Sequence, residues 1–308
     1  MNIVFMGSAE FGLPALEALI QKHRICGIVT TPAKPQGRGL KLSESPVAVF
    51  AEQHNLGPVL QPDSLKSTEF INTLQSLNAD LFVVIAFRIL PRAVFSIPKY
   101  GTINIHASLL PRFRGPAPIH RAIEAGEQCS GITIFRIDEG IDTGEILFQA
   151  SVDIGSMETT PELYERLSRL GAQSINDAIM KLDSGETAYL PQDHSLSCKA
   201  PKLCKEEARI DWTLPAETIF NKIRAFKPFP GTYCMSDNKR LGIDSALVVD
   251  SANVAVPGTI TSIGDTYFDV ACNPGLLRVV KVKPEGRRMM DTHDYLLGSR
   301  LTEGYRLT

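Results

Sequence analysis

The chain has 308 residues, with 32 basic and 34 acidic side chains, and it is 44% hydrophobic and 21% charged. This is the composition of a globular protein of about two domains, which excludes a disordered chain, a collagen and a coiled coil. The net charge of −2 also excludes a polycation that coats nucleic acid, so any nucleic-acid contact must come from local basic patches.

The start of the sequence has no basic segment followed by a long apolar run, so no secretory signal is predicted. The longest apolar stretch, 81–87, is far shorter than the roughly 18 residues of a membrane span. The six cysteines form no Cys-x-x-Cys pair, and the six histidines are dispersed. We therefore expect reduced structural thiols, no metal site and a cytoplasmic protein.

In the first half of the chain, short apolar runs alternate with amphipathic ones. Strands are predicted at 2–6, 25–29, 59–60, 80–86, 102–106, 132–137 and 145–154. Helices are predicted from Leu13 onward, near 46–54 and 65–77, and over 161–182. Strands that alternate with helices indicate a doubly wound, mostly parallel α/β sheet.

Gly7 and Gly12 follow the first strand and open the first helix, where a phosphate loop would lie. The segment lacks the middle glycine of a dinucleotide fingerprint, and Leu13 and Pro14 replace the Lys and Ser/Thr of a Walker motif. A plain strand–helix turn is the favoured interpretation.

The second half has a different pattern. Residues 184–208 are polar and punctuated by Gly185, Pro191 and Pro201, as in a linker. Short strands follow at 233–235, 241–249, 258–263, 267–271 and 276–282, which is typical of a small barrel or sandwich. We predict a domain over 1–189, a linker over 190–208 and a second domain over 209–308.

Five basic side chains and one acidic side chain, Glu285, lie within residues 278–288. The basic residues are Arg278, Lys281, Lys283, Arg287 and Arg288. A solvated strand edge explains such a run by itself. On a small barrel, however, the same patch makes single-stranded or structured RNA a reasonable partner.

Two polar side chains end the strand predicted at 102–106. Side chains alternate between the faces of a strand, so Asn104 and His106 share one face, whereas Ile103 and Ile105 share the other. Open α/β sheets bind ligands at the carboxyl ends of their strands. A satisfied polar pair is the simpler alternative, but the Pro-Arg-Phe-Arg-Gly-Pro segment that follows favours a site.

The turn after the next strand carries Asp138 and Asp142, and Gly140 and Gly144 flank Asp142. Its Asp-Thr-Gly sequence also occurs in aspartic proteases, but those enzymes pair two such loops across all-β lobes. Only one copy is present here, in an α/β context. A functional carboxylate and a turn-capping aspartate both remain open.

Asparagine, histidine and aspartate together suit direct attack by a substrate amine on an activated carbonyl. Asn104 and His106 can donate hydrogen bonds to the oxyanion of a tetrahedral intermediate. Asp142 can orient the imidazole or accept a proton through water. Ser108 lacks a recognisable nucleophile elbow, so no covalent nucleophile is predicted.

These residues resemble the folate-dependent formyltransferases. The core of the resemblance is Asn104-x-His106-x-Ser108-Leu-Leu-Pro, followed by Asp142 in its glycine-flanked turn. Three further stretches resemble the family members that act on tRNA, so the match covers nearly the whole chain. They are Lys-Pro-Gln-Gly-Arg-Gly-Leu-Lys-Leu at 34–42, Lys-Glu-Glu-Ala-Arg-Ile-Asp-Trp at 205–212 and Ile-Arg-Ala-Phe-Lys-Pro-Phe-Pro-Gly at 223–231.

The resemblance implies a Rossmann-type N-terminal domain that binds 10-formyltetrahydrofolate and a C-terminal barrel similar to an OB fold. It implies that the catalytic residues are Asn104, His106 and Asp142. The implied folate-binding residues are Ser108, Leu109, Leu110, Pro111, Phe87, Ile89 and Leu90. The family usually has Ala-Tyr-Gly-x-Ile-Leu-Pro where this chain has Ala-Phe-Arg-Ile-Leu-Pro at 86–91, which lacks the glycine and is one residue shorter.

Contacts with tRNA are expected from two regions. The loop at 31–46 resembles the family insertion that meets the acceptor end of initiator tRNA, and it carries Lys34, Arg38 and Lys41. The basic run of the second domain adds Lys281 and Lys283.

The resemblance thus implies transfer of a formyl group to the free α-amine of methionine on initiator tRNA. We expect a monomer without DNA or membrane partners. One alternative is formyl transfer to a small amine such as a sugar nucleotide or glycinamide ribonucleotide. The residues after 208 count against the latter, whose enzymes are about one domain long. A second alternative is a non-catalytic RNA-binding protein, which would bind tRNA and form no product.

Overall fold

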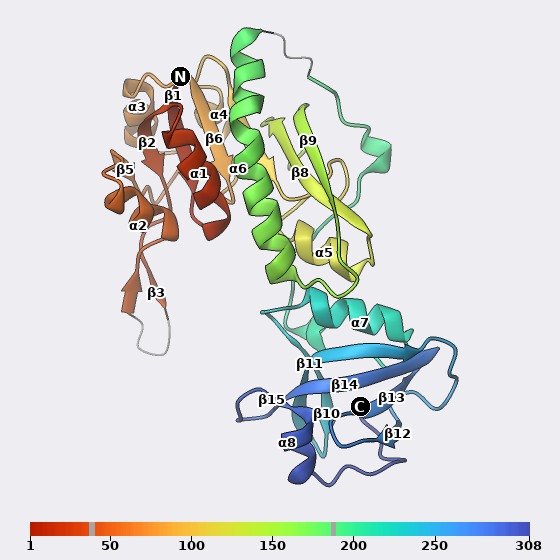
Figure 1. The fold of residues 1–308 in the computed structure, drawn as a ribbon. Helices are drawn as coiled ribbons and strands as arrows, with labels where there is room; N and C mark the ends of the chain where they lie inside the picture. The colour runs from red at the N-terminus through yellow and green to blue at the C-terminus, as the bar shows by residue number, and fades with distance from the viewer. Residues whose placement is uncertain (37–40, 186–188) are drawn as a thin grey trace. The chain divides into compact units, whose positions relative to one another are not determined.

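The computed structural model describes residues 1–36, 41–185 and 189–308, which divide into two compact units (Figure 1). Unit 1 comprises residues 1–118, 129–153 and 164–200, and unit 2 comprises residues 119–128, 154–163 and 201–308. The domain boundaries that the sequence suggests, with a linker over 190–208, stay a prediction.

Unit 1 is built on a seven-stranded sheet with the order β5-β2-β1-β6-β7-β8-β9. The strands are β1 (Asn2–Gly7), β2 (Arg24–Val29), β5 (Val59–Leu60), β6 (Leu81–Ile85), β7 (Thr102–His106), β8 (Cys129–Arg136) and β9 (Ile146–Asp153). The first five strands of this order pair in parallel, and the β7–β8 and β8–β9 pairs are antiparallel. The predicted doubly wound, mostly parallel sheet is confirmed. A separate hairpin consists of β3 (Lys34–Gln36) and β4 (Lys41–Ser43).

Helices cover both faces of this sheet (Figure 1). They are α1 (Leu13–Ile20), which follows the short helix η1 (Glu10–Gly12), α2 (Pro46–Gln53), α3 (Thr68–Ser76), α4 (Arg92–Phe95) and most of α6 (Thr160–Ser184). On one face α6 packs against α1: the Asn176 amide donates to the Ala18 carbonyl at 3.0 Å, and the ring of Tyr164 meets that of Phe11 edge-on at 5.1 Å. On the other face α3 and α4 bury apolar side chains against β1 and β6.

The packing of α6 determines which face of the sheet carries each side chain of β7. A Cβ built on Gly171 of α6 would lie 3.4 Å from the Ile105 side chain, so the Ile103 and Ile105 face of β7 contacts α6. Side-chain alternation then puts Asn104 and His106 on the opposite face. After His106 the chain continues as a loop to residue 117.

Unit 2 is a small antiparallel β-domain with the strand order β10-β11-β14-β13-β12 and β15 paired to β14. The strands are β10 (Thr232–Ser236), β11 (Lys239–Asp250), β12 (Ile260–Ile263), β13 (Phe268–Cys272), β14 (Gly275–Pro284) and β15 (Met290–Asp291). The helices are α5 (Pro118–Glu124), α7 (Ala216–Ala225), α8 (Thr292–Leu297) and the short η3 (Glu206–Ala208). Phe268, Leu277 and Val279 alternate inward and pack with Trp212 and Ile223 in one core, as the predicted small barrel requires.

Arg224 binds the start of α6 within unit 2. Its side chain is 7% exposed and donates to the carbonyl of Glu158 at 3.0 Å, and the Thr160 hydroxyl donates to the Ala225 carbonyl at 2.7 Å. Burial lowers the pKa of the Arg224 guanidinium from its ordinary value. One stretch of the family resemblance, 223–231, therefore includes a residue with a structural role.

All six cysteines are free thiols. Cys129 and Cys204 are exposed, whereas Cys234 and Cys272 are buried in the core of unit 2. Burial raises the pKa of Cys234 and of Cys272 from 9.0 to about 12. The folded state therefore favours the neutral thiols.

We expect iodoacetamide at mildly alkaline pH to modify Cys129 and Cys204 quickly and to spare Cys234 and Cys272, because the thiolate is the reactive form. The free energy of unfolding should also fall as pH rises above 9, since the unfolded chain ionises these two thiols before the folded one does. Peptide mass spectrometry of native and denatured protein measures the labelling. Equal rates at Cys234 and Cys204 in the native protein would contradict this.

Candidate active site

The imidazole of His106 lies buried at the carboxyl end of β7, with an oxygen atom next to each ring nitrogen. Nε2 is 2.9 Å from the Phe113 carbonyl oxygen, and Nδ1 is 3.6 Å from Oδ2 of Asp142. A carbonyl only accepts hydrogen bonds, so Nε2 carries a hydrogen. Nδ1 is then the nitrogen that exchanges a proton, and a carboxylate lies beside it.

Asp142 comes from the 138–144 turn between β8 and β9, and the two aspartates of this turn have different roles. Oδ1 of Asp138 accepts from the Gly140 amide at 2.9 Å and from the Thr143 hydroxyl at 2.7 Å, so Asp138 caps the turn. A Cβ on Gly144 would overlap the Arg136 carbonyl oxygen, so the turn needs a glycine there. Asp142 is left free to face His106.

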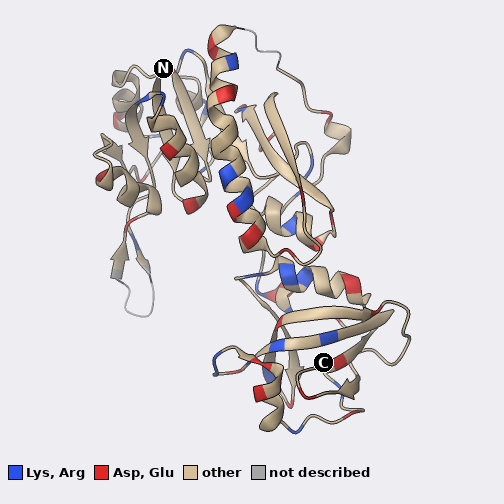
Figure 2. Cartoon of the chain, in the orientation of Figure 1, with Lys and Arg blue, Asp and Glu red and all other residues tan. Residues whose placement is uncertain are grey.

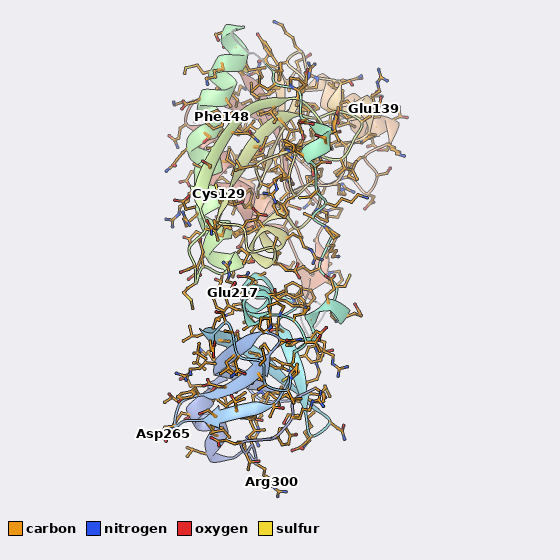
Figure 3. The ribbon with its side chains drawn as sticks, turned by 90° about the vertical axis from the view of Figure 1, so that its right-hand side faces the viewer. Cys129, Glu139, Phe148, Glu217, Asp265 and Arg300 are labelled. Atoms are coloured by element: carbon orange, nitrogen blue, oxygen red, sulfur yellow. The ribbon has the colours of Figure 1, made fainter. Side chains whose placement is uncertain are left out.

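The backbone of Asp142 has a φ of +54°, in the left-handed region that few residues with a Cβ adopt. Oδ2 accepts a hydrogen bond from the Gly115 amide at 2.8 Å, and the Asp142 carbonyl accepts one from the Gln192 side chain at 3.0 Å. The carboxylate is thus held by long-range contacts. Figure 3 labels Glu139 of the same turn, whose exposed carboxylate pairs with Arg92 at 2.9 Å.

Asn104 lies on β7 two residues before His106, on the same face by strand alternation. Within the described residues its amide makes no hydrogen bond to protein, so its N–H groups are available to a ligand. The structure therefore brings His106 and Asp142 into contact, and Asn104 lies on the same strand face as His106.

The predicted folate residues after β7 are mostly internal. Ser108 and Leu110 are buried, and the Ser108 hydroxyl donates to the Arg112 carbonyl at 2.7 Å. The hydroxyl of Thr133 on β8 accepts from the Leu110 amide at 3.0 Å and donates to the Ser108 carbonyl at 2.7 Å, which fixes the loop.

The other predicted folate segment, 86–91, follows β6 at the carboxyl edge of the sheet. The sheet order reverses between β1 and β6, and such a switch point is where open α/β sheets bind ligands. Leu90 is 6% exposed and belongs to the core, and Phe87 packs against that core, whereas Ile89 is 76% exposed. Of these three residues, Ile89 offers an apolar side chain to a ligand.

The predicted tRNA contacts lie in both units. Lys34 is exposed at the start of β3, Lys41 begins β4, and Arg38 lies outside the described residues. On β14, among the basic positions in Figure 2, Lys283 is exposed and Lys281 half-buried. Arg278, which the sequence groups with them, binds both carboxylate oxygens of Asp269, at 2.8 and 2.9 Å.

Sequence reasoning missed Thr133 and Gln192, because each acts through a contact distant in sequence. It favoured a site near the segment that contains Phe113 and Gly115 but assigned no role to their backbone groups. Among residues 1–36, 41–185 and 189–308, no group of three or more His, Cys, Asp and Glu side chains could hold a metal ion. Nor does any helix of that part of the chain have the length and apolarity to cross a bilayer.

Two family models match this chain. The model described as "Formyl transferase" matches residues 1–179, and the one described as "Formyl transferase, C-terminal domain" matches residues 202–300. The α/β sheet with its imidazole–carboxylate pair, followed by a small β-domain, thus defines a formyl transferase.

Two curated relatives cover almost the full length. Each is a methionyl-tRNA formyltransferase. The one from Geobacter metallireducens is 41% identical over 309 residues, covering 100% of this chain and 98% of the relative. The one from Citrifermentans bemidjiense is 42% identical over 306 residues, covering 99% and 95%. The chain belongs to the methionyl-tRNA formyltransferase family.

Solved structures of similar fold are more distant. The sugar 3N-formyl transferase WlaRD has a TM-score of 0.67 at 18% identity, covering 94% of this chain and 99% of that one. HypX from Aquifex aeolicus in complex with tetrahydrofolic acid has a TM-score of 0.63 at 17% identity, and this chain covers 47% of its length. These similarities show the fold, and with the family models they confirm the predicted fold class.

We expect Thr133→Val to lower the free energy of unfolding by about 2–6 kcal/mol, since it leaves two buried backbone groups without a partner and each costs about 1–3 kcal/mol. The change keeps the side-chain shape and removes the hydroxyl that binds Leu110 and Ser108. Thr133→Ser keeps the hydroxyl and should cost clearly less. Urea denaturation compares the variants, and equal losses would show that the hydroxyl does not hold the loop.

Proposed function

We propose that this protein transfers the formyl group of 10-formyltetrahydrofolate to the free α-amine of methionyl initiator tRNA in the cytoplasm. The observation that carries the proposal is the contact between His106 and Asp142, at 3.6 Å, beside the amide of Asn104. It occurs in a chain that aligns end to end with methionyl-tRNA formyltransferases.

The site supports direct transfer between the two substrates. The amine attacks as the free base, and because an α-amino group has a pKa of about 7.7–8.0, a neutral fraction exists near pH 7. A C–N bond forms to the formyl carbon, and the carbonyl oxygen becomes an oxyanion. Asn104 stabilises that oxyanion by hydrogen bonding, and His106 does so through Nδ1 when that nitrogen is protonated, because Nε2 donates to the Phe113 carbonyl.

Collapse of the intermediate breaks the bond from the formyl carbon to the folate nitrogen. Asp142 accepts the proton lost by the attacking amine, through water, and keeps the imidazole oriented. Nδ1 of His106, 3.6 Å from the Asp142 carboxylate, takes up that proton and donates it to the departing folate amine. The buried position of the pair strengthens these electrostatic interactions, because the local dielectric is low.

The carboxyl edge between β1 and β6 suits the formyl donor, a planar ring system joined to a polar tail. Exposed Ile89 and partly buried Phe87 supply apolar surface there. Because the side chains of Ser108, Leu110 and Leu90 are internal, we assign their contribution to the backbone and to pocket shape. Leu109 and Pro111, each half-buried, complete the proposed folate contacts.

The tRNA substrate would be held by basic groups of both units. Lys34, Arg38 and Lys41 belong to the loop predicted to meet the acceptor end, and Lys281 and Lys283 lie on β14. Arg278 is excluded from this set, because its guanidinium pairs with Asp269 and lies 3.6 Å over the Tyr267 ring. We propose a monomer that engages tRNA and neither DNA nor membranes.

We expect Asn104→Ala, His106→Ala and Asp142→Ala each to lower turnover at least about tenfold, since one oxyanion donor is typically worth about 10²–10³ in rate. Formylation of charged initiator tRNA in the presence of 10-formyltetrahydrofolate measures turnover. Circular dichroism and thermal melts check that each variant stays folded. Near-normal turnover in all three folded variants would remove the mechanism.

The same assay separates the alternatives. Charged elongator tRNA, a sugar nucleotide with a free amine and glycinamide ribonucleotide replace initiator tRNA in parallel reactions. Product from small amines alone would favour the small-amine enzyme, and tRNA binding that survives His106→Ala with no product from any amine would favour the RNA-binding protein.

Charge reversal at exposed predicted contacts should weaken tRNA binding. We expect Lys34→Glu and Lys283→Glu each to raise Kd and to reduce the dependence of log Kd on log salt by about one unit for each phosphate that the protein no longer neutralises. Lys66→Glu reverses the charge of an exposed lysine outside the predicted set and should have little effect. Filter binding over a range of salt concentrations tests this. An equal effect in all three variants would point to net charge instead of a specific tRNA interaction.

A further inference from the structure

A single buried amide lies in an exposed stretch of chain beyond α6. Gln192 is 7% exposed, whereas Pro191 and residues 193–197 are all exposed. Buried amides are stable only when their polar atoms are bonded. The partners of Gln192 therefore indicate why it is inside.

Both hydrogens of the Gln192 amide are used on the 138–144 turn. Nε2 donates to the carbonyl of Asp142 at 3.0 Å and to the carbonyl of Gly144 at 2.7 Å. These two carbonyls lie on either side of Thr143, shortly before β9 begins. One side chain thus holds the backbone of Asp142 from outside the turn.

Arg114 fixes which way the amide points. Its Nε and Nη2 atoms donate to Oε1 of Gln192 at 3.2 and 2.5 Å. A guanidinium only donates hydrogen bonds, so the oxygen of the amide must face Arg114 and the nitrogen must face the turn.

The 190–200 segment also holds the other partner of His106. The Phe113 amide donates to Sγ of Cys198 at 3.1 Å, the Arg114 amide donates to the Cys198 carbonyl at 2.9 Å, and the Ala200 amide donates to the Arg114 carbonyl at 2.6 Å. Phe113 supplies the carbonyl that binds Nε2 of His106. Residues 190–200 therefore contact the backbone of both residues that face the imidazole, Phe113 and Asp142.

We infer that Gln192 is a positioning residue of the formyl transfer, which holds Asp142 in its left-handed conformation with the carboxylate at His106. This inference rests on the proposed function. Asp142 has a φ of +54°, and no hydrogen bond within the turn itself engages its carbonyl. Without the two donors of Gln192 the turn relaxes, and the carboxylate moves away from Nδ1 of His106.

The test compares Gln192→Met, which keeps the length of the side chain and removes its donors, with Gln192→Glu. The glutamate still accepts from Arg114 but offers no donor to the two carbonyls. We expect kcat to fall about tenfold to a hundredfold in both, as a misplaced catalytic group costs. The KM values for both substrates should change little, because Gln192 contacts neither in the proposed site. Gln75→Met, at an exposed glutamine on α3 outside both proposed substrate sites, is the matched control and should keep wild-type kinetics.

A double-mutant cycle separates positioning from general support of the fold. If Gln192 acts through Asp142, Gln192→Met lowers kcat in the wild type and has no further effect on Asp142→Ala. An equal loss in both backgrounds, or a wild-type kcat in Gln192→Met, overturns the inference. If Gln192→Met does not fold, the same cycle with Gln192→Glu decides. A wild-type protein that forms no formylated tRNA would instead overturn the proposed function.

Discussion

A buried imidazole needs a partner on each nitrogen, and the active-site region of unit 1 is arranged around this requirement. His106 finds the Phe113 carbonyl at 2.9 Å on one side and the Asp142 carboxylate at 3.6 Å on the other. Neither partner lies on β7, so two separate loops must reach the same ring. The bond from the Gly115 amide to Asp142, at 2.8 Å, joins those loops directly. A shift in either loop therefore strains the bond that joins it to the other.

In the 138–144 turn, two carboxylates have separate roles. Asp138 binds within the turn and determines its shape, as Asp residues commonly do. Asp142 makes no bond inside the turn and takes a conformation that is unfavourable without external support. That support comes from Gly115 and Gln192, which lie in segments distant in sequence. Local interactions thus build the turn, whereas tertiary interactions aim its functional side chain.

The sequence predicts the parts of this protein that depend on periodicity. Strand and helix positions follow from apolar spacing, and the shared face of Asn104 and His106 follows from alternation along a strand. The roles of Asp138 and Asp142 are not separable in the sequence, because both lie in one glycine-flanked turn. Thr133 and Gln192 give no signal at all: they bind Leu110 and Asp142 across 23 and 50 residues. The burial of Ser108 and Leu90 is likewise a result of tertiary packing, which a motif match does not show.

The residues that do chemistry and the residues that hold them in place are therefore separated along the chain. The N-terminal family model ends at residue 179, after Asn104, His106 and Asp142 but before the segment that holds them. The sheet would keep its parallel core if residues 190–200 detached, because β1, β6 and β7 pair without them. The imidazole, however, would lose the support of both its oxygen partners. Local opening is cheaper than global unfolding, so activity should fail at a lower denaturant concentration than the sheet does.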